Sequence, residues 1–257
     1  MKSGFLAFTK KEWRELWRGG KLFILLAIFV LFGIMNPAIA KLTPWLMEQM
    51  ADELAGSGLT VSAMSVDAST SWAQFFKNAP MAVLLFLVLF AGCLTNECRR
   101  RTLIPLLTRG LSRHSVIAAK AVVMAAVWTV GYWLCFAITL GYNMYFWGDG
   151  EMARTALAAT FFYLFGLWMI AMLLAFSVPA KSGTSVLAWL VLLVAVCYIA
   201  GMLPGVAQWL PTGLLSAGAL AAGQGKADEF VRAAVAAGIT GIAGYGAAVA
   251  GFLRKRI

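Results

Sequence analysis

Residues 22–40 read LFILLAIFVLFGIMNPAIA, a run without a single charged side chain. A helix rises about 1.5 Å per residue, so a run of this length crosses the roughly 30 Å of hydrocarbon in a bilayer. Lipid offers no partners for unpaired backbone groups, and the runs are too long for barrel strands, so each predicts a transmembrane helix. Five further runs without a charge at their centre follow at residues 79–96, 116–142, 155–177, 184–203 and 231–253.

The composition agrees with lipid as the main solvent of this chain. Hydrophobic residues make up 61% of it, charged residues 12%, and the mean hydropathy is +0.82. A soluble domain of this size could not cover its surface with so few polar groups. The four cysteines form no CxxC pair and indicate packing. We therefore expect an all-α integral membrane protein, with residues 1–257 forming a single transmembrane domain.

The basic residues predict the orientation of the six spans. Sixteen Lys and Arg residues fall on the side of the two termini and five on the other side, which also carries eight of the eleven acidic residues. This bias places both termini in the cytoplasm. The net charge of +10 is split into short clusters between spans, which favours an anionic lipid bilayer over nucleic acid as the partner. Cysteines at Ser57 or Gly150 should then react from outside, and cysteines at Ser112 or Ser182 should not.

The first span has a second interpretation. Basic residues, an apolar core and the sequence Ala38-Ile39-Ala40 also resemble a cleavable signal peptide, which would leave five spans in the same orientation. The leader of twenty-one residues, with its tryptophans, is long and bulky for such a signal, which favours an uncleaved span.

Residues 5–18, FLAFTKKEWRELWR, have the period of an amphipathic helix. One face carries Leu6, Thr9, Leu16 and both tryptophans, a second face is basic, and a third is acidic. We expect this helix to lie in the cytoplasmic membrane interface, as an anchor alone or also as a contact for a cytoplasmic partner. Its candidate interface residues are Glu12, Trp13, Arg14 and Trp17.

The loop after the second span, residues 97–120, predicts a short helix. Leu103, Leu106 and Leu107 have i, i+3, i+4 spacing, Pro105 fits the first turn, and Gly110 marks the end. An exposed apolar surface of this kind needs a partner, unless its side chains dip into the membrane. Glu97, beside three arginines, is expected to fix the start of the loop by local ion pairing.

This loop resembles that of the ABC-2 type transporter permeases, whose pattern runs E-x-x-x-G-T-L-x-x-L-L-x-x-P-x-S-R with a later G-K. The opening sequence KEWRELWR at residues 11–18 is similar to the first helix of that family. The chain departs from the pattern at Arg101, Gly110 and Ala119, where Gly, Pro and Gly are common. The matching residues are Glu97, Arg101-Thr102-Leu103, Leu106-Leu107-Thr108, Leu111-Ser112-Arg113 and Lys120.

The resemblance implies a function. In that family the loop carries a coupling helix that docks on a separate ATP-hydrolysing subunit, and the N-terminal helix packs beside it. It implies two ABC ATPase subunits holding ATP and Mg, a second permease copy or homologue, export, and the cytoplasmic membrane of a prokaryote. It also implies a re-entrant extracellular hairpin around residues 203–215. The ATPase-coupling residues would be Glu97, Arg101, Thr102, Leu103, Leu106, Leu107 and Arg113.

Other activities lack their motifs. The sequence contains no G-x-x-x-x-G-K-[ST], since Gly223-Gln-Gly225-Lys226 lacks the upstream Gly and the following Ser or Thr. The single His114 cannot build a zinc or Ser-His site within the membrane, so we expect no catalytic residues, metal or cofactor in this chain. Half of a secondary transporter, or a non-transporting membrane subunit, stays an alternative. Spans without central charges favour an amphipathic, lipid-like or peptide cargo.

Small residues follow one another at four-residue spacing in the sixth span, with Ala233, Ala237 and Gly241 on one row. Such rows allow close approach of helices, either within the chain or between two permeases.

Overall fold

The computed structural model describes residues 2–55, 67–148, 152–203 and 205–255, and every regular element in this part of the chain is a helix. Ser57 and Gly150 lie outside the described residues. The elements are α1 Lys2–Arg18, α2 Lys21–Ala55, α3 Ala68–Phe90, α4 Thr95–Arg99, α5 Ile104–Thr108, α6 Arg113–Trp147, α7 Met152–Ser177, α8 Gly183–Gly201, η1 Ala207–Trp209, η2 Pro211–Ala217, α9 Gly218–Ala221 and α10 Ala227–Arg254.

Six of these helices, as far as the described residues extend, are long and apolar enough to cross a membrane: α2, α3, α6, α7, α8 and α10. The prediction of six spans is confirmed. Each helix begins before its apolar run, but α3 ends at Phe90, where a turn at residues 91–94 follows, and α8 ends at Gly201, short of the predicted residues 96 and 203. The largest difference is in α2, which continues past residue 40 to Ala55, so that Ala38-Ile39-Ala40 lies inside the helix.

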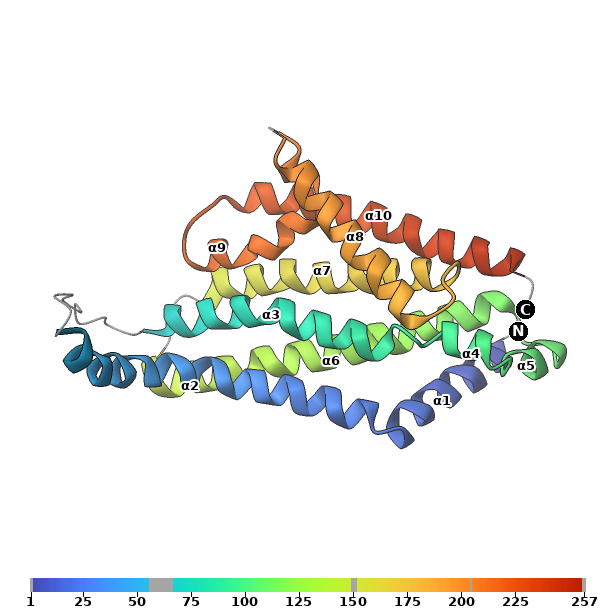
Figure 1. The fold of residues 1–257 in the computed structure, drawn as a ribbon, viewed down its shortest axis with the longest axis horizontal. Coiled ribbons are helices and arrows are strands. Elements are labelled where there is room, and N and C mark those ends of the chain that lie inside the picture. Colours follow the sequence, from blue (N-terminus) through green and yellow to red (C-terminus); the bar gives the residue numbers. More distant parts are fainter. Residues whose placement is uncertain (1, 56–66, 149–151, 204, 256–257) are drawn as a thin grey trace.

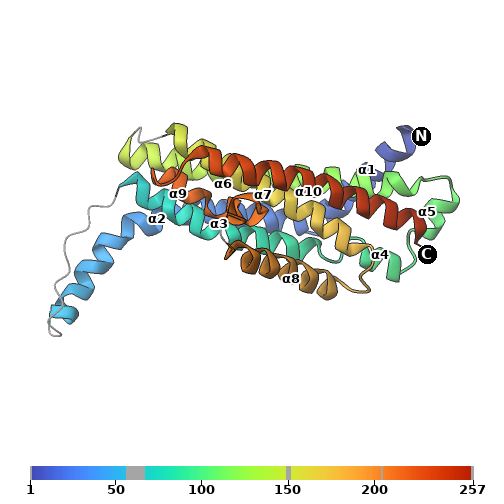
Figure 2. The same cartoon turned by 90° about the horizontal axis from the view of Figure 1, so that it is seen from above.

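The spans form an elongated bundle (Figure 1). Helix α2 packs against α3 and α6, and α10 packs against α7, while α8 crosses the bundle obliquely. Both chain ends lie at the same end of the bundle as α4 and α5, and α1 leads from there to α2 (Figures 1 and 2). The two termini and the loop after the second span are therefore on one side, which is the arrangement that an even number of spans requires.

Glycines allow aromatic side chains to fill the centre of the bundle. Trp128 is 1% exposed, and its indole lies where a Cβ on Gly166 would come within 2.2 Å of the ring. Phe29 occupies the corresponding space beside Gly131. Phe29 packs edge to face on Trp128, and Tyr132 stacks on that indole. Since lipid is as apolar as these side chains, such close van der Waals packing stabilises the bundle more than burial from water does.

A buried polar cluster joins the first three spans. The Asn78 amide donates to Asn36 Oδ1 at 2.9 Å, the Asn36 amide donates to Thr139 Oγ1 at 3.4 Å, and Thr139 Oγ1 donates to the Gly33 carbonyl at 3.1 Å. Asn36 and Thr139 are fully buried. Asn36 is thus part of the helix packing between α2, α3 and α6.

The row of small residues in the last span packs against another helix of the same chain. Ala233, Ala237 and Gly241 are buried, and a Cβ on Gly241 would lie 3.6 Å from Trp168 of α7. Trp168 Nε1 also donates to Thr240 Oγ1 at 2.9 Å. Between α8 and α10 the chain forms η1, η2 and α9. That this segment is a hairpin entering the bilayer from outside stays a prediction.

Candidate functional site

Four charged side chains from three helices close a ring at the end of the bundle that carries the termini. Lys11 and Glu12 come from α1, Glu97 from α4 and Lys120 from α6. Lys11 Nζ lies 2.6 Å from Glu97 Oε1 and 3.0 Å from Glu12 Oε1, and Lys120 Nζ lies 2.8 Å from Glu97 Oε2 and 2.9 Å from Glu12 Oε2. Each carboxylate therefore holds both ammonium groups. We call these four residues the charged ring.

The charged ring is largely withdrawn from water. The side chain of Lys120 is 2% exposed, those of Glu97 and Glu12 are 11% and 12% exposed, and that of Lys11 is 40% exposed. A charge in such a place is tolerated only when it is paired and hydrogen-bonded. The ring of Phe8, itself buried, lies 5.2 Å from Lys11 Nζ and 5.8 Å from Lys120 Nζ and adds cation–π attraction.

Lys11 also contacts Glu15 of the same helix, at 2.8 Å on the exposed side. Burial alone would lower the pKa of Lys11, but hydrogen bonds to Glu15 and Glu97 outweigh burial and raise the pKa above its ordinary value. Lys11 is therefore positively charged at any physiological pH. Glu12, Glu15 and Glu97 place carboxylate oxygens within 4.8 Å of one another. Lys11 contacts all three carboxylates and Lys120 contacts two of them, so two positive charges are shared among three negative charges in an ionic junction.

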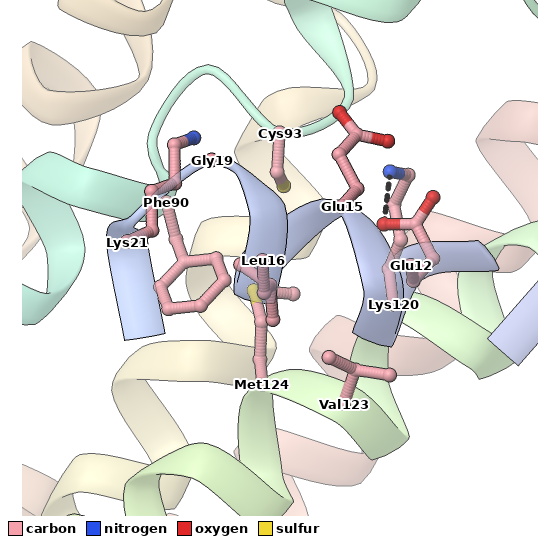
Figure 3. A pocket seen from close by; sticks show the side chains of 10 residues that line it. All are labelled: Glu12, Glu15, Leu16, Gly19, Lys21, Phe90, Cys93, Lys120, Val123 and Met124. Carbon is pink, nitrogen blue, oxygen red and sulfur yellow. Dashed lines mark hydrogen bonds and ion pairs between the residues drawn. The ribbon is translucent and has the colours of Figure 1, made fainter. Parts of the chain in front are cut away.

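A cavity of about 150 Å³ lies beside the charged ring (Figure 3). Glu12, Glu15 and Lys120 line one part of it, and Cys93 lies at the turn that follows α3. The rest of the lining is Leu16, Gly19, Lys21, Phe90, Val123 and Met124. Helix α1 thus covers the ends of α3 and α6 that adjoin the loop, with charges on one side and apolar contacts on the other.

The backbone of the loop is shaped by one strained residue. Arg101, which follows α4, has a φ of 56°, a left-handed conformation that favours glycine. This turn brings the Thr102 amide to the Glu97 carbonyl at 3.2 Å, with the Thr102 hydroxyl donating to the same oxygen at 3.4 Å. The glycine common at this place in the family pattern fits the same geometry. Gly110 has a φ of 90°, which a proline could not adopt.

The structure places the predicted docking residues differently. Leu103 is fully buried within the chain, so its prediction as an exposed contact is wrong. The turn at Arg101 directs it inward, where it packs with the core of the bundle. Leu106 and Leu107 are half-buried against the same core, and the exposed positions of α5 and its C-cap are Pro105, Thr108 and Arg109.

Arg113 lies at the first position of α6 and binds the other end of the chain. Its guanidinium donates to the carbonyls of Phe252 at 3.2 Å and Leu253 at 3.0 Å, and also to that of Lys255. A cation on the carbonyls at this end stabilises the C-terminus of α10. Arg113 thus connects the loop to the last span, a role that its position in the sequence did not reveal.

The N-terminal helix divides its faces as follows. Trp13, Arg14 and Trp17 are exposed, while Leu16, predicted to share the tryptophan face, is 7% exposed and packs into the bundle. Glu12 points inward into the charged ring. That α1 lies in a membrane interface stays a prediction.

Sequence reasoning missed the partners of Glu97. The carboxylate pairs with Lys11 and Lys120, and not with the neighbouring arginines as predicted, because α4 turns it toward α1 and α6. Lys11, Phe8 and Lys120 were not among the predicted site residues. One signal was present: Lys120 lies within an apolar run, and a lysine there needs a carboxylate.

The fold and the charged ring define a multi-pass helical membrane protein with a loop unit joined to its N-terminal helix at one end. The chain belongs to the ABC-2 family transporter protein family, which matches residues 6–214 and so includes most of α1, the loop and the charged ring. Such a permease is a membrane subunit of an ABC transporter and works with an ABC ATPase subunit, being not itself the ATPase.

One relative is similar over most of its length. It is the "Uncharacterized transmembrane protein YxlG" of Bacillus subtilis (strain 168), 22% identical over 208 residues that cover 80% of each chain. No solved structure matches significantly.

Proposed function

We propose that this chain is the permease subunit of an ATP-driven exporter, and that the charged ring transmits movement from the ATPase to the membrane helices. The observation that carries the proposal is that Glu97 of the loop binds Lys11 of α1 and Lys120 of α6 at once. A displacement of the loop therefore displaces α1 and α6 together. In this proposal two copies of the permease, or one copy and a homologue, associate with two ATPases.

The ATPase docks on the exposed side of the loop. Pro105, Thr108 and Arg109 provide that surface. Next to it a groove of about 390 Å³ separates α1 from the loop, with Leu106 and Arg109 on one side and Ala7 and Lys11 on the other. An ATPase surface with an apolar side chain and a carboxylate fits this mixture of apolar and basic lining.

In this proposal ATP is hydrolysed in the ATPase subunit and not in this chain. ATP and Mg bind in the ATPase, and the loop receives the resulting motion. Helix α4 follows the last turn of α3 after four residues, and Lys120 lies in the second turn of α6. Movement of the loop thus acts directly on the cytoplasmic-loop ends of α3 and α6, while Arg113 extends it to α10.

The cargo in this proposal is amphipathic, lipid-like or a peptide. The charged ring lies at one end of the spans, and their middle offers aromatic and apolar side chains with a few amides and hydroxyls. A strongly charged solute would find no compensating charge there. Export across the cytoplasmic membrane of a prokaryote, with both termini in the cytoplasm, completes the proposal.

The test is affinity purification of the wild-type chain with its neighbours, followed by measurement of ATP hydrolysis. Thr108→Asp combined with Arg109→Glu should abolish recovery of the ATPase, because both positions lie on the proposed contact surface. Lys181→Glu, at another exposed cation, in the short loop before α8, is the control and should recover the ATPase fully.

Equal recovery with the wild type and the double variant would overturn the docking surface. Recovery of no ATPase with the wild type would favour a non-transporting subunit.

A further inference from the structure

A second hollow lies far from the charged ring, where α8 ends and the segment between α8 and α10 packs against it. It has a volume of about 400 Å³ and includes Tyr198, Gly201, Met202, Leu210 and Leu215 in its lining. None of its lining residues is charged. The volume is within the range of small-molecule sites in proteins. We call this hollow the α8 groove.

The wall of the α8 groove belongs to a membrane-spanning helix that the rest of the chain barely covers. Met202 is 84% exposed and Tyr198 is 61% exposed. Tyr198 lies in α8, which is long and apolar enough to cross the bilayer, and Met202 caps the end of that helix, so both exposed side chains are placed to meet acyl chains. The groove is thus an apolar recess that opens toward acyl chains.

A cation is fixed at the edge of this recess. Arg232, near the start of α10, donates from its guanidinium to Gln208 Oε1 at 2.6 Å and lies 6.0 Å from the centre of the Trp209 ring. Gln208 is next to Ala207 and Trp209 is next to Leu210, and both of these neighbours line the α8 groove. The guanidinium therefore contacts residues that are one position away from the lining.

The described residues provide no ion-pair partner for the Arg232 guanidinium. Asp228 and Glu229 precede it by one turn, but none of the ion pairs among the described residues involves Arg232, and its hydrogen-bond partner is the uncharged Gln208. A guanidinium has five N–H donors and binds phosphate well. Within the described residues this guanidinium donates to Gln208, and its other N–H groups are available to an anion.

We propose that the α8 groove binds one anionic phospholipid of the surrounding membrane, with an acyl chain in the recess and the phosphate at Arg232. The uncharged apolar recess suits the acyl chain of such a lipid, and the cation beside it suits the phosphate. Trp209, half-exposed beside the guanidinium, is the residue type found at headgroup depth. The site is separate from the loop and does not depend on the ATPase.

The probe is phosphatidylglycerol with a photoactivatable diazirine in its acyl chain, compared with phosphatidylcholine carrying the same chain. The full-length permease is irradiated in vesicles of either lipid, and the labelled peptides are identified by mass spectrometry. We expect label on residues 197–216, with phosphatidylglycerol preferred roughly fivefold, the factor that one basic residue near a membrane surface provides.

Two variants separate the headgroup from the acyl chain. Arg232→Gln should remove the preference and leave the acyl label, while Lys77→Gln, at an exposed lysine away from the groove, should change nothing. Gly201→Phe should reduce the label from both lipids by filling the recess. A Cβ at Gly201 meets only Leu210 at an ordinary 3.5 Å, so this position accepts a side chain.

Equal labelling by the two lipids in the wild type, or an unchanged preference in Arg232→Gln, would overturn the proposal. So would efficient disulfide-linked dimers of a Met202→Cys variant without lipid label, since a second copy would then cover the groove.

Discussion

Replacing Glu97 by glutamine tests the charged ring most directly. The substitution keeps the shape of the side chain but removes the charge that Lys11 and Lys120 share. An exposed local ion pair, such as the sequence alone suggests for Glu97, is worth about 0–1 kcal/mol. The structure indicates a larger energy, because the side chain of Glu97 is 11% exposed and that of Lys120 is 2% exposed.

Breaking a buried pair from one side costs about 3–5 kcal/mol. Lys11 is partly in water and its contact is screened, so we expect the lower limit, about 3 kcal/mol, for the docking of α1 in Glu97→Gln. This corresponds to a change of roughly two orders of magnitude in the equilibrium between docked and released α1.

Cys93 provides the assay, because it lines the cavity that α1 covers (Figure 3). In a chain that retains only this cysteine, the rate of maleimide labelling reports how often α1 is released. Glu97→Gln should raise that rate strongly and reduce ATP-driven transport while the ATPase still co-purifies. Glu15→Gln is the control, since Glu15 also binds Lys11 but is 62% exposed, and it should change the rate little.

Equal labelling rates in Glu97→Gln and Glu15→Gln would refute the reasoning. So would strict additivity of Glu97→Gln and Lys120→Gln, because residues in one ring must show an interaction energy.

Three further predictions follow from single residues. Arg101→Gly should stabilise the protein by about 1 kcal/mol in thermal unfolding, since it relieves the left-handed backbone conformation. Gly166→Ala should destabilise it by roughly 1–3 kcal/mol and alter tryptophan fluorescence, because the new methyl group would overlap the indole of Trp128. If both termini are cytoplasmic, a cysteine at Gln224 should react with an impermeant reagent in intact cells, and one at Thr108 should not.

Each of these has its own control. Arg100 has a right-handed backbone, so Arg100→Gly should bring no gain, and a gain of equal size would remove the explanation from Arg101. A Cβ added at Gly238 would meet only open space, so Gly238→Ala should be tolerated. Reaction of the Thr108 cysteine from outside would reverse the orientation.

Local pattern and bilayer thickness were sufficient to predict the spans. Each apolar run, such as residues 22–40, must be helical in lipid, and the structure has a helix at each. The ends of the helices were not predictable in this way, because polar turns such as those of α2 beyond residue 40 continue a helix without any apolar signal.

In the loop, by contrast, local pattern was not sufficient to predict the side-chain contacts. The i, i+3, i+4 pattern indicated a short helix correctly, but a single left-handed residue rotates its start and buries Leu103. The partners of Glu97 lie 86 residues before it and 23 residues after it, and the distances between them depend on how three helices pack. Charge patterns within one loop favour pairs between neighbouring residues. The sequence therefore did not predict the charged ring, which joins residues of three helices.

The closed geometry of the charged ring bears on how the protein responds to its surroundings. Mobile ions weaken attractions between exposed charges that are farther apart than a Debye length, about 8 Å at physiological ionic strength. Here oppositely charged atoms lie within 3.0 Å of one another, and three of the four side chains are nearly sealed from the solvent. Mobile ions therefore screen these attractions little. A cell that loses water and concentrates its ions would therefore keep this connection between loop and spans intact, while weaker contacts on the protein surface fade.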